Sequence, residues 1–280
     1  MNASPAPSDA LTALLAFWHE AGVEDCFESA PVDRTRETAP PPKAARAQPA
    51  PGPSTVTPLR RAPSAVSPTG SLADVVARAR AAARTPDSLE SLTEAIRGFE
   101  ECPLSGMGAR QAVVWRGQAT APVMIVGEGP GAEEDAQGLP FVGRAGKLLD
   151  RMLAAAGLDG RVMIINTVFW RPPGNRTPTP EEQAICAPFL ERAFELVRPK
   201  RVLTVGAAAA RAVLRTSEGI TRVRGNWGEW HLPEGGVSAP VMPTLHPAFL
   251  LRQPQAKALV WADLLDLAAR LDGNDSKSPH

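Results

Sequence analysis

The 280-residue chain contains no tyrosine, and only 5% of its residues are aromatic, so each phenylalanine and tryptophan carries weight. Its three cysteines are widely separated, which excludes a disulfide framework and, by spacing alone, a zinc motif. No apolar run approaches the roughly 18 residues of a membrane-spanning helix, and the first residues lack the pattern of a secretion signal. The 30 basic residues balance the 30 acidic ones, which argues against non-specific coating of polyanions but permits a local basic groove. We therefore expect a soluble, cytoplasmic protein with no membrane contact.

Proline is in excess, and residues 31–70 hold ten of the 29 prolines. Such a segment cannot bury enough apolar surface to offset the entropy of ordering, so we expect a disordered Pro/Ala-rich linker. Before it, within residues 1–30, the apolar residues from Leu11 to Trp18 have the spacing of a short amphipathic helix that docks on the main domain or binds a partner. The predicted domains are this helix, the linker, a folded domain over 71–272 and a disordered tail over 273–280.

Short apolar runs alternate with helical patterns in the second half of the chain. The apolar runs cover residues 123–126, 161–168, 201–205 and 241–245, and the helical patterns cover 148–153, 180–197, 207–214 and 255–271. Two further helices are expected within 71–99, separated at Thr85-Pro86. Strands that are apolar throughout and alternate with helices are typical of a parallel sheet covered on both faces. The predicted fold class is α/β, a three-layer αβα arrangement with a central, mainly parallel sheet.

The polar and glycine residues of interest follow directly after these strands. Gly127, Asn166, Gly206 and His246 each stand at or just beyond the end of an apolar run. Ligands of open α/β sheets bind beyond the carboxyl ends of the strands. We therefore expect these residues to meet at one edge of the sheet.

The first of these turns reads GEGPGAEED over residues 127–135, followed by Phe141 in a loop between a proline and a glycine. Its glycines permit a sharp turn and close approach of a ligand, and its carboxylates make it a poor phosphate cradle. The alternative is an ordinary turn before an acidic helix start. Phe141 is either a core residue or a stacking platform for a flat ligand.

The other two turns carry Asn166 and His246. A side-chain amide at a strand end offers an acceptor and two donors, which suits the edge of a base, although an asparagine that caps its own loop is the competing interpretation. A lone histidine is usually structural. The loop after Asn166 is basic, and residues 171–224 contain ten basic and five acidic residues, a net charge of +5 in a neutral protein.

Together these segments resemble the family 4 uracil-DNA glycosylases. The stretches that carry the resemblance are GEGPGAEED (127–135), PFVGRAGKLLDRML (140–153), NTVFWRPPGNRTP (166–178) and HPAFLLR (246–252). They occur in the family's order and at its separations, within a resemblance that runs from about residue 98 to 271. Residues 1–97 carry no motif of the family.

The resemblance implies an enzyme that flips uracil out of DNA and hydrolyses its N-glycosidic bond. It implies that Gly127, Glu128 and Gly129 line the base pocket, with Gly129 at the place where other uracil-DNA glycosylases use an aspartate. Phe141 would then stack on uracil, Asn166 would bind its N3/O4 edge, and His246 would stabilise the departing base. Glu134 is the first candidate for handling the attacking water, and Glu128 is the alternative. The candidate DNA contacts are Arg171, Arg176 and Arg252 for phosphates, with Leu250 and Leu251 as a wedge into the vacated stack.

One departure from the family concerns its four-iron–four-sulfur cluster, which is held by four cysteines. The corresponding positions here are Phe99, Cys102, Trp170 and Cys186, so only two thiols remain where four are needed. We predict that the cluster is lost and that no cofactor or metal is bound. Cys102 and Cys186 are then neighbouring buried thiols, and Cys26 is incidental.

The expected partners are uracil-containing DNA and a repair or replication protein that contacts the N-terminal helix, with the chain itself a monomer. The first rival is a protein that binds uracil-DNA covalently, but its family carries an added histidine-containing loop, which the stretch 144–153 lacks. The other rivals are a non-catalytic scaffold, disfavoured by the intact Glu128, Phe141, Asn166 and His246, and a small-molecule α/β enzyme.

Overall fold

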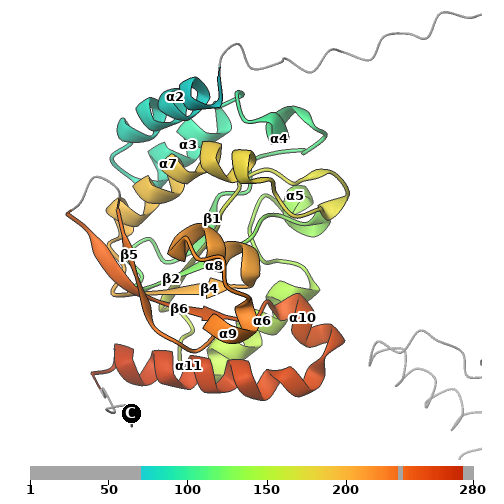
Figure 1. Ribbon diagram of the computed structural model, residues 1–280, viewed down its shortest axis with the longest axis vertical. Helices are drawn as coiled ribbons and strands as arrows, with labels where there is room; N and C mark the ends of the chain where they lie inside the picture. Colours follow the sequence, from blue (N-terminus) through green and yellow to red (C-terminus); the bar gives the residue numbers. More distant parts are fainter. Residues whose placement is uncertain (1–70, 233–235, 274–280) are drawn as a thin grey trace, which may run out of the picture. The chain divides into compact units, whose positions relative to one another are not determined.

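A six-stranded β-sheet forms the centre of the protein, with the strand order β1-β3-β2-β4-β6-β5 (Figure 1). The computed structural model describes residues 71–232 and 236–273. The predicted N-terminal helix, the linker, Cys26 and residues 274–280 of the predicted tail lie outside these ranges. Within the described ranges, no helix combines the length and apolarity needed to cross a membrane.

The four central strands are parallel and overlap the four apolar runs of the sequence, although β6 begins three residues before its run. They are β3 (Val162–Asn166), β2 (Val123–Gly127), β4 (Arg201–Val205) and β6 (Ser238–Thr244). The edge strands β1 (Trp115–Gly117) and β5 (Gly228–His231) are antiparallel to their neighbours. These two strands are missing from the sequence prediction because three or four residues with a glycine among them leave no readable alternation. The predicted mainly parallel sheet is confirmed.

Helices begin where the sequence supplies capping residues. Ser71, Ser88 and Thr179 each accept a backbone N–H in the first turn of α2 (Leu72–Arg84), α3 (Leu89–Arg97) and α7 (Pro180–Val197). The predicted break at Pro86 lies between α2 and α3. The remaining helices are α4 (Pro103–Gly106), α5 (Ala132–Gln137), α6 (Arg144–Ala155), α8 (Ala207–Leu214), α9 (Ile220–Val223), α10 (Pro247–Arg252) and α11 (Lys257–Leu271), with short 3-10 turns at Pro173–Asn175 and Pro254–Ala256.

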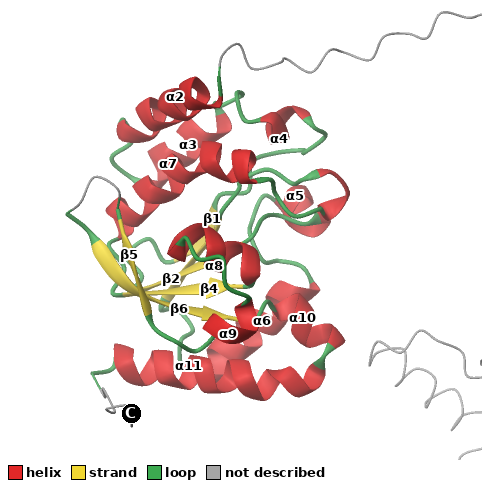
Figure 2. Ribbon diagram, in the orientation of Figure 1, coloured by secondary structure: helices red, strands yellow, loops and turns green. Residues whose placement is uncertain are grey.

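Helices lie on both sides of the sheet (Figure 2), and the sheet separates two apolar cores. In β2, Met124 and Val126 pack toward α2, α3, α7 and α8, whereas Val123 and Ile125 pack toward α6, α10 and α11. Since successive side chains of a strand point to opposite faces, a strand buried on both faces must be apolar at every position. The two cores explain the continuous apolar runs and confirm the three-layer αβα fold.

The carboxyl ends of the parallel strands lie at one edge of the sheet. Gly127 at the end of β2 is in register with Asn166 at the end of β3. The N–H of Gly206, just past β4, donates to the carbonyl of Thr244 at the end of β6, 2.9 Å away. His246 follows two residues later. The fold therefore brings four strand ends from distant parts of the sequence to one edge of the sheet.

Candidate active site

Phe141, Asn166 and His246 converge beside Gly127. A Cβ atom at position 127 would overlap both the Asn166 Oδ1 and the Phe141 ring, so the absence of a side chain there lets the amide and the ring meet. The ring centroids of Phe141 and His246 are 5.7 Å apart, with the ring planes inclined by 32°. The predicted convergence of an aromatic ring, a side-chain amide and an imidazole is thus present in the fold.

The side chain of Asn166 is buried without a partner. The residue is 1% exposed. Neither its Oδ1 nor its Nδ2 has a hydrogen-bond partner among the described residues. An unmade hydrogen bond of a buried polar atom costs about 1–3 kcal/mol. The competing interpretation, an asparagine that caps its own loop, is therefore wrong, and the amide remains available to a ligand.

His246 is a neutral imidazole with a defined tautomer. As the N-cap of α10, its Nδ1 accepts the backbone N–H of Ala248 at 3.1 Å, which leaves the proton on Nε2. Burial, followed by the charge of Arg252, lowers the pKa of His246 to about 4 from its ordinary 6.5, against a smaller opposite effect of Glu134. At neutral pH this side chain is a hydrogen-bond donor without a charge.

Phe141 sits in a strained backbone conformation. Its φ angle is +55°, in the left-handed region that non-glycine residues seldom adopt. The Glu134 carboxylate supports the residues that follow, because Oε1 accepts the N–H groups of Val142 at 3.0 Å and Gly143 at 2.9 Å. Oε2 accepts the N–H of Gly131 at 3.1 Å. Three of the roughly four lone-pair positions of this carboxylate are therefore engaged with backbone.

A cleft of about 600 Å³ opens beside Phe141 and His246, whereas Gly127 and Asn166 lie behind its lining residues. The sequence-predicted residues that line it are Glu128, Gly129, Glu134, Phe141, Arg176, His246 and Arg252. The lining also includes Asn175, Thr177, Pro178 and Phe249, to which the sequence analysis assigned no role, although the RPPGNR and HPAFLLR stretches contain or adjoin them. A Cβ at Gly129 would lie 2.8 Å from the Val168 Cγ2, so any side chain there would require Val168 to move.

Comparison with known proteins assigns the chain to a family. The family model of the uracil DNA glycosylase superfamily matches residues 114–265. The type-4 uracil-DNA glycosylase of Thermotoga maritima is 43% identical over 166 residues, which cover 59% of this chain and 83% of that protein. The corresponding type-4 protein of Pyrobaculum aerophilum is 38% identical over 181 residues, covering 63% of this chain and 91% of that protein. The chain belongs to the type-4 group of the uracil-DNA glycosylase superfamily.

The superfamily likeness extends to another type. The type-5 uracil-DNA glycosylase of Pyrobaculum aerophilum is 33% identical over 167 residues, covering 53% of this chain and 72% of that protein. Gly127, Phe141, Asn166 and His246 all lie inside the region that the superfamily model matches.

One of the predicted DNA contacts, Leu250, does not lie at the surface. Leu250 is fully buried, in the core between the sheet and α6, α10 and α11, so its predicted role as a wedge is wrong. The six-residue α10 turns Leu250 inward, and this leaves Phe249 and Leu251 outside, 37% and 40% exposed. Phe249, which also lines the cleft, takes the place of Leu250 as an apolar surface residue.

The basic residues near the cleft differ in their pairing. Arg176 donates two hydrogen bonds to Glu182, at 2.6 and 2.9 Å, and remains partly exposed. The Arg171 Nε donates to the Asn175 Oδ1 at 2.7 Å. Arg252 is exposed at the cleft, close enough to His246 to lower the pKa of that imidazole.

The residues at the family's cluster positions do not fit an iron–sulfur cluster. The Sγ atoms of Cys102 and Cys186 are 3.9 Å apart, and both residues are fully buried, as predicted. Phe99 and Trp170 are 7% and 4% exposed, and Phe99 packs edge-on against Phe189. Burial raises the pKa of the Cys186 thiol. In the described ranges, no group of three His, Cys, Asp or Glu side chains could hold a metal ion.

Proposed function

We propose that this protein hydrolyses the N-glycosidic bond between uracil and deoxyribose in DNA and leaves an abasic site. The observation that carries the proposal is the buried Asn166 amide, which lacks a partner in the described chain and adjoins an aromatic ring that in turn lies beside a neutral imidazole. Buried polar atoms without partners are rare unless a ligand completes them. Membership of the type-4 group supports the same reaction.

The hydrogen-bond donors and acceptors of the base pocket formed by Phe141, Asn166 and His246 explain how the base is recognised. Uracil must first rotate out of the stack, at a cost of about a few kcal/mol. Phe141 then stacks on the ring, while the Asn166 Oδ1 accepts from N3–H and Nδ2 donates to O4. Cytosine reverses this pattern, which leaves buried groups unpaired and lowers its excision by orders of magnitude. The turn at 127–131, with Gly127 and Glu128, forms the wall against the methyl group of thymine.

The chemical step separates a base anion from a sugar with developing positive charge. The bond between C1′ and N1 breaks, and its electron pair leaves with uracil, where much of the charge lies on O2. The His246 Nε2–H donates to O2, a contribution of roughly 3–4 kcal/mol if it equals other oxyanion donors. A water oxygen forms the new bond to C1′.

Two carboxylates are candidates for receiving the proton of that water. Glu134 is the first candidate from the sequence, but its carboxylate accepts three backbone hydrogen bonds that hold the loop. Glu128 lines the same cleft and is half-exposed. We therefore assign proton acceptance to Glu128 and the positioning of the Phe141 loop to Glu134.

The rest of the DNA is bound by residues outside the base pocket. Arg252, Arg171 and Arg176 are the proposed phosphate contacts, and the exposed Leu251 and Phe249 fill the space that the flipped base leaves. The protein is proposed to act as a monomer in the cytoplasm. A contact between the N-terminal helix and a repair or replication protein stays a prediction, because that helix lies outside the described residues.

A single assay separates this reaction from its rivals. End-labelled DNA with one uracil is incubated with excess protein, and half of each sample is heated in alkali before a denaturing gel. A glycosylase yields a cleaved strand only after alkali. A covalent binder yields a retarded adduct, and a non-catalytic binder yields neither band, so either result contradicts the proposal. DNA with thymine at the same position is the control.

We further propose that the enzyme works without an iron–sulfur cluster. We expect protein purified without oxygen to contain no stoichiometric iron or sulfide, because a cluster requires four ligands and only two buried thiols occupy its place. Chelators should leave the melting temperature and the excision rate unchanged, and Cys102→Ala/Cys186→Ala should still excise uracil. Metal analysis that finds close to four iron atoms per chain would contradict this.

A further inference from the structure

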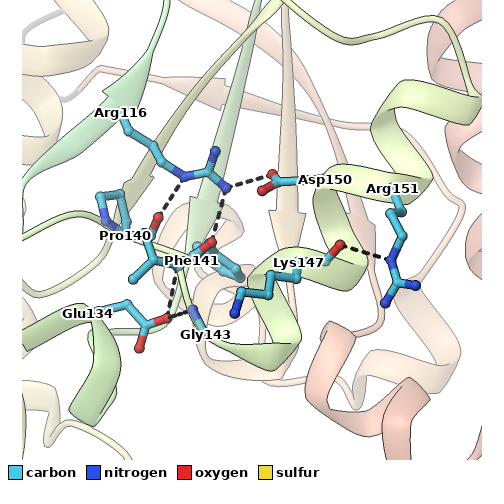
Figure 3. A network of polar contacts seen from close by, with 9 residues as sticks. Arg116, Glu134, Pro140, Phe141, Gly143, Lys147, Asp150 and Arg151 are labelled. Atoms are coloured by element: carbon cyan, nitrogen blue, oxygen red, sulfur yellow. Dashed lines mark hydrogen bonds and ion pairs between the residues drawn. The ribbon is translucent and has the colours of Figure 1, made fainter. Parts of the chain in front are cut away.

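Arg116, on the edge strand β1, reaches the loop that carries Phe141 (Figure 3). Its Nε donates to the Pro140 carbonyl at 2.7 Å, and its Nη2 donates to the Phe141 carbonyl at 3.1 Å. The same Nη2 is 2.6 Å from the Asp150 Oδ1 on α6. Arg116 lies outside the motifs that carry the family resemblance, and it is not part of the cleft lining.

The guanidinium and the Glu134 carboxylate hold opposite groups of one short segment. Arg116 donates hydrogen bonds to the carbonyl groups of residues 140 and 141, and the Glu134 carboxylate accepts hydrogen bonds from the N–H groups of residues 142 and 143. Phe141, in the middle, has a φ angle of +55°. A left-handed conformation is unfavourable for a non-glycine residue, so it persists only where the surroundings hold it.

Helix α6, which follows this segment, packs against it. A Cβ at Gly146 in α6 would overlap the Phe141 carbonyl, so that carbonyl lies directly against the helix backbone. It is the same carbonyl that receives the Arg116 hydrogen bond. The backbone of Phe141 is thereby fixed by a cation, a carboxylate and a glycine on the face of α6, and this backbone sets the direction in which the side chain leaves the chain.

We infer that Arg116 is a positioning residue for uracil excision, which acts by holding Phe141 in its left-handed conformation so that the ring faces Asn166 and His246. The inference rests on the proposed function. Arg116 touches neither the base nor the water, and its effect passes through the ring of Phe141. A misplacement of about 1 Å in a reacting geometry can lower a rate by about 10²-fold, so loss of these two hydrogen bonds is measurable.

The test is a double-mutant cycle on single-turnover excision. Arg116→Gln should lower the rate by about 10- to 100-fold in the unmodified chain. In a Phe141→Ala background, the same change should lower it by less than about 3-fold, because the ring through which Arg116 acts is gone. Arg116→Lys, which keeps a cationic donor, should recover part of the rate and provides a second variant if Arg116→Gln does not fold. Arg151→Gln is the matched control, since within the described ranges the side chain of that arginine donates only to the Lys147 carbonyl on its own helix.

Three outcomes would overturn the inference. If Arg116→Gln excises uracil at the unmodified rate, the contact has no role in positioning. If it lowers the rate equally with and without the Phe141 ring, Arg116 supports the fold in general and does not act through that ring. Failure of the unmodified chain to excise uracil would instead remove the proposed function, and this inference with it.

Discussion

Asn166→Ala is expected to lower single-turnover uracil excision by about 10²- to 10³-fold without loss of stability. The substitution removes both hydrogen bonds to the N3/O4 edge of the base. The amide has no partner in the described part of the folded chain, so its removal breaks no internal hydrogen bond. Deleting a buried polar group that lacks a partner relieves a desolvation cost, which offsets the small cavity that alanine leaves.

The measurement pairs excision with thermal unfolding of the same protein. Asn226→Ala is a suitable control, because the side chain of this exposed asparagine donates, within the described residues, only to the Arg222 carbonyl in α9, and the variant should keep the full rate. Excision by Asn166→Ala at the unmodified rate would remove the amide from base recognition. A fall in rate that matches a large fall in melting temperature would make Asn166 a structural residue instead.

His246→Ala is expected to lower excision by a similar 10²- to 10³-fold, because it removes the donor to O2 of the departing base. The loss should not depend on pH between about 5.5 and 8. With a pKa of about 4, the imidazole is neutral throughout that range, so the ratio of the two rates stays constant. A ratio that changes near pH 6.5 would mean that this imidazole titrates in the active enzyme and would contradict the neutral donor.

The same depressed pKa links His246 to stability. The folded protein keeps this imidazole neutral down to about pH 4, whereas the unfolded chain takes up a proton near pH 6.5. The unfolded state therefore binds more protons in that window, and the free energy of unfolding falls as the pH falls through it. His246→Ala lacks this group and should lose stability less steeply over the same range, which unfolding measurements at several pH values would detect.

The central sheet was predictable because burial on both faces requires a continuous run of apolar residues in the sequence. Each β2 residue from Val123 to Val126 packs in one of the two cores and therefore had to be apolar. The end of the apolar run then marked the end of the strand. The convergence of Asn166 and His246 followed in turn, since parallel strands end at the same edge. The edge strands β1 and β5 have no such run because each is short and partly exposed.

What the sequence could not reveal are properties that depend on side-chain direction. HPAFLLR reads as two exposed leucines, yet α10 buries Leu250 and exposes Leu251. Glu134 is three residues into an acidic helix start, where nothing in the spacing indicates three backbone N–H partners. Arg116 lies 24 residues before the nearest carbonyl that it holds, and only the fold brings the two together.

The most direct test is a structure of the protein bound to uracil-containing DNA whose glycosidic bond has been made resistant to hydrolysis. The account predicts the flipped base against the Phe141 ring, with its N3 and O4 at hydrogen-bond distance from the Asn166 amide and its O2 at hydrogen-bond distance from the His246 Nε2. A base that lies elsewhere, or that leaves the Asn166 amide without a partner, would contradict it.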